Sequence, residues 1–118
     1  MNTDLRAAWL VRSGDVLASA DIADTPQSRR KGVIGRTELT NAMVITQCKW
    51  IHTIGVKVPL DVAYLDAVGT VIKTERVKPL RISAPVSRCK TVVEASAGSF
   101  ERWNLRVGDE VEVRHVER

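Results

Sequence analysis

Two short runs of mostly apolar residues open the chain, and a polar turn separates them. Ala7–Val11 and Val16–Ile22 have the composition of strands, while Ser13, Gly14 and Asp15 between them are turn-forming residues. The pattern predicts a β-hairpin at the start of the chain.

A short helix is expected after this hairpin. The side chain of Thr25, or less favourably that of Asp24, can cap the free amide groups of a helix, and Pro26 suits the first helical position because an N–H there would have no partner. The helix is predicted to contain Gln27–Ile34 and to end at Gly35, which can adopt the left-handed conformation found past helix ends.

The chain is rich in Val, Ile, Thr and aromatic residues from Ala42 onward, which favours strands. Four strands are predicted in this part, over Ala42–Gln47, Trp50–Val56, Leu60–Leu65 and Val68–Val77. The last two are expected to form a second hairpin around a turn at Asp66–Gly69.

The last third of the chain combines a loop with shorter elements. Residues 78–90 contain two prolines and no regular apolar period, so a long loop is predicted there. A strand over Thr91–Ala95, a helical turn from Gly98 through Trp103 and a last strand over Val111–His115 are expected to follow.

Many strands with only two short helices predict an α+β fold that is mainly β, with an antiparallel or mixed sheet curled into a barrel-like body. The helices do not alternate with the strands, which disfavours a doubly wound sheet. The length of 118 residues fits a single domain over residues 1–118.

The composition of the chain indicates where in the cell the protein is located. The polar residues 1–6 and the short apolar run after them do not form a signal peptide, and no apolar stretch approaches the roughly 20 residues that span a bilayer. We therefore expect a cytoplasmic protein that does not contact a membrane.

Cys48 and Cys89 are expected to be thiols rather than a disulfide. No ligand set is spaced for zinc, so neither a metal nor a cofactor is expected.

The net charge of +4 is unevenly placed along the chain. Residues 73–90 contain one acidic residue, Glu75, and six basic ones: Lys73, Arg76, Lys78, Arg81, Arg88 and Lys90. A second basic cluster consists of Arg29, Arg30, Lys31 and Arg36. We favour solvated surfaces for both, because no aromatic residues are interleaved for base stacking. Weak binding of nucleic acid or a nucleotide through residues 73–90 remains an alternative.

The common catalytic signatures are absent, and the most distinctive polar residues are His52, Thr53 and Asp61. In an extended strand, Cys48 and His52 would share one face, but their α-carbons would be roughly 13 Å apart, which disfavours a catalytic pair. Asp61 is a candidate hydrogen-bond partner for His52. At the start of its strand, it is more readily explained as an acceptor of backbone amides.

Several spaced motifs occur together in the order Ala23-Asp24-Thr25-Pro26, Arg29-x-x-Gly32-x-x-x-Arg36, His52-Thr53-x-Gly55, Pro59-Leu60-Asp61-Val62, Glu94-Ala95-x-Ala97-Gly98 and Gly108-Asp109. Over about residues 17–113, the chain resembles the uncharacterised proteins grouped as domain of unknown function 192. This resemblance implies a compact β-rich fold with short helices, and it implies no established activity.

These observations favour a non-catalytic binding module over an enzyme. Arg29, Arg36, His52, Thr53 and Asp61 are predicted to line or brace one pocket for a small ligand, and the two arginines would suit an anionic one. The alternative is a hydrolase or transferase with His52 as the general base and Asp61 orienting it.

Overall fold

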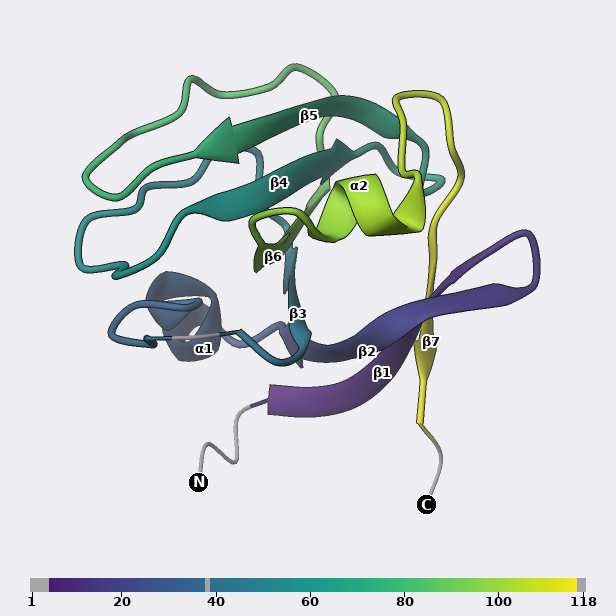
Figure 1. Cartoon of the computed structure of the whole chain (residues 1–118), viewed down its shortest axis with the longest axis horizontal. Coiled ribbons are helices and arrows are strands. Elements are labelled where there is room, and N and C mark those ends of the chain that lie inside the picture. The colour runs from purple at the N-terminus through teal and green to yellow at the C-terminus, as the bar shows by residue number, and fades with distance from the viewer. Residues whose placement is uncertain (1–4, 38, 117–118) are drawn as a thin grey trace.

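The computed structural model describes residues 5–37 and 39–116, so residues 1–4 of the polar start lie outside the described part. Within it, the chain forms two short helices and seven strands (Figure 1). In chain order these are β1 (Leu5–Arg12), β2 (Asp15–Ala23), α1 (Pro26–Lys31), β3 (Ala42–Thr46), β4 (Leu60–Leu65), β5 (Val71–Val77), β6 (Thr91–Ser96), α2 (Ser99–Trp103) and β7 (Glu112–His115). The expected mainly β fold with two short helices is confirmed.

The strands form one mixed sheet in the order β5-β4-β6-β3-β2-β1-β7. Neighbouring strands are antiparallel except β2 and β3, which run parallel and are joined through α1. This βαβ connection places α1 beside one face of the sheet, because a parallel pair needs a crossover.

The two edges of the sheet approach each other at one end. The N–H of Val71 donates to the Asp109 carbonyl (2.8 Å), and the N–H of Val111 donates to the Gly69 carbonyl (2.9 Å). The named strands do not close into a barrel, but these bonds join the start of β5 to the residues before β7. The curled, barrel-like body predicted from the sequence is therefore present in this open form.

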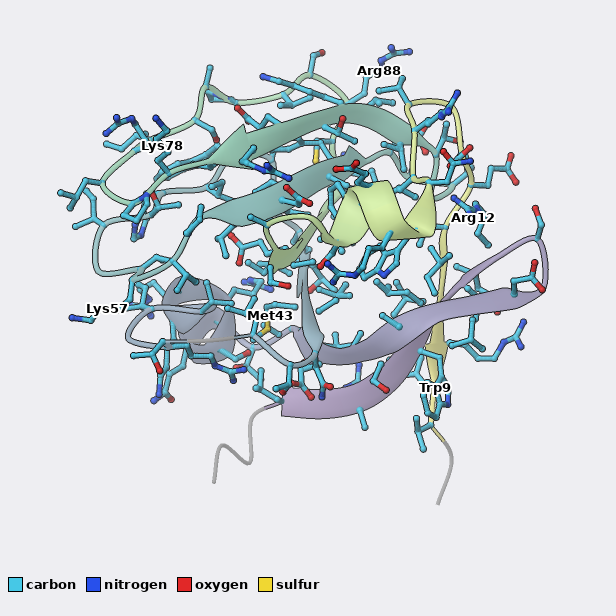
Figure 2. The ribbon with its side chains drawn as sticks, in the orientation of Figure 1. Trp9, Arg12, Met43, Lys57, Lys78 and Arg88 are labelled. Carbon is cyan, nitrogen blue, oxygen red and sulfur yellow. The ribbon has the colours of Figure 1, made fainter. Side chains whose placement is uncertain are left out.

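The central strands β3, β4 and β6 separate two apolar clusters. Ala63 of β4 and Val93 of β6 pack with Phe100 of α2 on one face. Val62 and Val92 belong to the second cluster on the other face, which also contains the following side chains: Val33, Met43, Ile45, Ile51 and Val56. Figure 2 shows Met43 on the side of the sheet where α1 lies. The side chains of β4 and β6 thus alternate between the face that packs against α2 and the opposite face, according to the two-residue period of a strand.

The predicted helix is correct at its start and wrong at its end. Thr25 and Ser28 form a reciprocal capping box, and Pro26 is the first helical residue. The helix ends at Lys31, because Gly32 takes a φ of +47° and its N–H bonds to the Ser28 carbonyl (2.9 Å). Only glycine adopts this backbone conformation readily.

The strand predicted over Trp50–Val56 is wrong. The structure describes all of these residues, and only His52 makes an isolated bridge, with Ile82. The backbone of this segment instead bonds to the long loop, as the Thr53 N–H does to the Arg81 carbonyl (2.7 Å). A turn at Gly55, with a φ of +86°, then ends the extended stretch.

The other predicted elements are present in the structure, two of them with later starts. Both hairpins form, Leu60–Leu65 matches β4, and residues 78–90 contain no strand among the residues described there. The predicted strands over Val68–Val77 and Val111–His115 begin too early, since β5 starts at Val71 and β7 at Glu112. No helix in residues 5–37 or 39–116 is long and apolar enough to cross a membrane.

Candidate functional site

A cavity of about 370 Å³ opens to solvent beside α1. Its walls come from α1 and the residues after it, from β3, and from the segment that follows β3. Figure 1 shows α1 and this segment at the same end of the molecule. Most of the wall is apolar, provided by Val33, Ile34, Ile45, Ile51 and Val56. The polar and charged lining side chains are Arg29, Arg30, Lys31, Gln47, Cys48, Lys49, His52 and Glu94.

Glu94 is the most unusual residue in this lining. It lies on the central strand β6, between Met43 of β3 and Val62 of β4, and it is 3% exposed. Its Oε1 atom has no hydrogen-bond partner, and no ion pair to Glu94 occurs among the described residues. Burial raises the pKa of Glu94 from 4.5 to about 7, because removal from water disfavours the charged form. A carboxyl group that is easily protonated therefore lies against the cavity.

The end of α1 packs directly against this carboxyl group. A Cβ atom at Gly32 would lie 3.7 Å from Glu94 Oε1 and 3.5 Å from Ile45 Cδ1. Gly32 thus ends the helix beside the side chain of Glu94, and its positive φ rather than crowding is what favours glycine there.

His52 contributes a second unpartnered polar atom. Its Nδ1 atom is buried without a hydrogen-bond partner, and its ring lies 6.3 Å from that of Trp50. In the part of the chain that the structure describes, His52 Nδ1 and Glu94 Oε1 are the two buried side-chain polar atoms without partners. Both residues line the same cavity. Buried polar groups are nearly always hydrogen-bonded, so these two atoms favour a polar ligand at this place.

Basic side chains surround the mouth of the cavity. Arg29, in the last turn of α1, donates to Gln47 Oε1 (3.1 Å) and to the Asp24 carbonyl (3.4 Å). Exposed Arg30, Lys31 and Lys49 are also in the lining. These groups favour an anion at the outer end of the cavity.

Cys48 also lines the cavity. The extended strand whose geometry disfavoured a catalytic pair of Cys48 and His52 does not form. The Cys48 Sγ atom donates to the Trp50 carbonyl (3.0 Å), and burial raises the pKa of its thiol. Cys48 is therefore a neutral thiol, which is a poor nucleophile. Both cysteines are free, as expected, and buried Cys89 donates to the carbonyl of Thr91 (3.3 Å).

The other predicted site residues lie elsewhere. Thr53 is fully buried, where its Oγ1 atom donates to the Lys78 carbonyl (2.6 Å) and accepts from the Arg81 N–H (2.8 Å). Thr53 thus fixes the long loop against the segment that lines the cavity. Arg36 lies outside the lining.

Asp61 faces α2, on the opposite face of the sheet from Glu94. Its carboxylate accepts from Arg76 Nε (3.0 Å) and from the backbone N–H groups of Gly98 (2.9 Å) and Phe100 (3.1 Å). This geometry matches the interpretation of Asp61 as an acceptor of backbone amides. The pair of His52 and Asp61 that the enzyme alternative requires is not formed.

The basic residues of segment 73–90 do not act as one group. Lys73 and Arg76 are on β5, where they pair with Glu75 (3.8 Å) and Asp61 (3.0 Å). Figure 2 shows Lys78 and Arg88 on the outer surface of the long loop.

Among the described residues, no group of three or more His, Cys, Asp or Glu side chains is placed to hold a metal ion.

The sequence-based prediction did not select Glu94, although a signal for it exists. Glu94 is the one acidic residue of its strand, and it stands between Val93 and Ala95. An acidic side chain in the middle of a buried strand is rare unless it has a partner or a function.

The family model DUF192, described as uncharacterized ACR, matches residues 8–113. A crystal structure of a protein of unknown function from Novosphingobium aromaticivorans is similar, with a TM-score of 0.76 and 18% identity over 92% of this chain and 84% of the other. A candidate transcription regulator from Sinorhizobium meliloti is similar with a TM-score of 0.73 and 22% identity over 92% of both chains. At these identities, the likeness concerns the fold alone. No curated protein matches the sequence.

Proposed function

The chain belongs to the uncharacterized DUF192 family, and we propose that it is a binding module for a small anionic molecule with an apolar body. The observation that carries this proposal is the pair of unpartnered buried atoms, His52 Nδ1 and Glu94 Oε1, in one cavity. The anionic group of a bound molecule can accept a hydrogen bond from the His52 ring, whereas Glu94 Oε1 requires a further N–H or O–H donor on the molecule.

The chemistry of the lining supports the same assignment. The apolar walls favour a hydrocarbon body, since burial of apolar surface contributes roughly 25 cal/mol for each Å². Arg29 and the exposed cations near it favour a negative charge at the mouth of the cavity. A largely apolar pocket with a few polar groups is typical of sites for small molecules.

Thermal unfolding with straight-chain alkanoates, from butanoate to octanoate, tests this proposal at pH 7. At ten times its dissociation constant, a bound alkanoate adds RT ln 11 to the stability, which raises the melting temperature by about 5 °C. Arg29→Gln should reduce this rise, since it removes a cation from the lining. His52→Ala should reduce it as well, because the alkanoate carboxylate then loses an N–H donor of the lining.

Arg36→Gln provides a matched control, because it removes the same charge from a residue outside the lining. It should leave the alkanoate-induced rise unchanged. The proposal is wrong if no alkanoate raises the melting temperature, or if Arg36→Gln reduces the rise as much as Arg29→Gln does.

A further inference from the structure

We infer that the natural ligand also carries a cationic N–H donor, such as a primary ammonium group, which contacts Glu94 while its acidic group remains at the basic mouth. The inference rests on the proposed function, since it specifies the molecule that the same cavity binds. It assigns the ligand to the class of amino acids whose two charged groups are separated by an apolar chain.

The uncompensated carboxyl group is the first reason. The neighbours of Glu94 on the adjacent strands, Met43 and Val62, are uncharged, as is Ile45 near Gly32. The ionisable groups of the same lining are Arg29, Arg30 and Lys31 of α1, and Cys48, Lys49 and His52 of the following segment. Among the described residues, none of them forms an ion pair with Glu94.

An ammonium group supplies what Glu94 lacks. It would donate to the unpartnered Oε1 atom and compensate the charge of the ionised carboxylate, as charge-assisted hydrogen bonds do. A hydroxyl group would donate to Oε1 but leave the buried charge without a counter-ion. Because the pKa of Glu94 is about 7, its ionised form is accessible at neutral pH.

Binding of the ammonium group must then be linked to a proton. The ligand binds the ionised form of Glu94, so a protonated Glu94 has to release its proton first. With a pKa of about 7, the ionised fraction falls about tenfold from pH 8 to pH 6, and the affinity falls with it. His52 is the histidine of the same lining, so a His52→Gln variant separates its contribution to the dependence on pH.

Isothermal titration calorimetry with matched probes tests the inference. The probes are ω-amino acids of four to eight carbon atoms and the alkanoates of the same length. At pH 8, the ω-amino acid of the best length should bind the wild-type protein about tenfold more tightly than its alkanoate. This gain should disappear at pH 6 and in Glu94→Gln. It should persist in the control Glu101→Gln, whose carboxyl group is exposed on α2. In His52→Gln, whatever the affinity for both probes, the gain should still be lost between pH 8 and pH 6.

The possible failures are distinguishable. If alkanoates bind and the amino group adds nothing, the inference is overturned while the proposed function stands. An equal gain in Glu94→Gln also overturns it, since the ammonium group then binds elsewhere. If no probe of either series binds, both the inference and the proposed function are wrong. Circular dichroism of Glu94→Gln establishes that a lost gain does not result from unfolding.

Discussion

Glu94 should make the stability of the ligand-free protein fall as the pH rises from about 4.5 to about 7. Over this range the folded chain keeps a proton on the buried carboxyl group, whereas the unfolded chain has lost it. The unfolded state therefore binds fewer protons, and the free energy of unfolding decreases with pH. The part of the free energy of unfolding that depends on protonation of Glu94 is fully present below pH 4.5 and is lost by about pH 7. The raised pKa corresponds to about 3 kcal/mol, at about 1.4 kcal/mol for each pH unit.

The substitution Glu94→Gln isolates this effect, because glutamine has nearly the same shape and no charge at any pH. Relative to the wild type, the variant should gain about 3 kcal/mol of stability between pH 4 and pH 8. Any cost of the new amide group shifts the difference by the same amount at every pH. Urea unfolding followed by tryptophan fluorescence, at intervals of half a pH unit, gives both free energies.

Glu101→Gln is the control, since it removes a carboxyl group that is exposed to solvent. Its stability relative to the wild type should change by less than about 0.5 kcal/mol over the same range. A flat difference for Glu94→Gln would refute the reasoning, because it would mean that Glu94 ionises in the folded protein as easily as in the unfolded chain.

Three further substitutions test the framework around the cavity. Thr53→Val should cost about 2 kcal/mol and speed hydrogen exchange at the Arg81 amide, which loses its bond to Oγ1; an unchanged exchange rate would contradict the proposed bracing. Asp61→Asn should lower stability in urea by about 3 kcal/mol, since an amide cannot accept from all three donors; any loss of alkanoate affinity would argue against its separation from the cavity. Gly69→Ala should lower the melting temperature more than Gly108→Ala. Both glycines have positive φ, but an added Cβ would lie 2.5 Å from a backbone oxygen at Gly69 and near no atom at Gly108; equal effects would show that the contact is relaxed.

The sequence by itself determined the elements whose causes are local. Ser13, Gly14 and Asp15 give the first hairpin, and Thr25 with Pro26 gives the start of α1. Leu60–Leu65 was predicted at its observed bounds, because its apolar composition and the neighbouring turn act within a few residues. The mainly β fold follows from the density of such signals.

Elements that depend on distant partners were not determined in this way. Trp50–Val56 has the composition of a strand, but its backbone groups bond to a loop about 30 residues later in the sequence. The end of α1 was predicted at Gly35 from the sequence. The structure shows that the helix ends at Gly32, where φ is +47° and the N–H bonds to the Ser28 carbonyl.

The candidate site shows the same division. The sequence indicated the polar residues and the strand of Glu94. Alternate residues of a buried strand face opposite sides of the sheet. Only the packing of the helices decides which of these side chains face α1 and which face α2. Asp61 faces α2 and is fully hydrogen-bonded, whereas Glu94 faces α1 and keeps an unpartnered oxygen. Burial without a partner is a property of the folded chain, so the tertiary structure alone distinguishes the structural carboxylate from the candidate ligand contact.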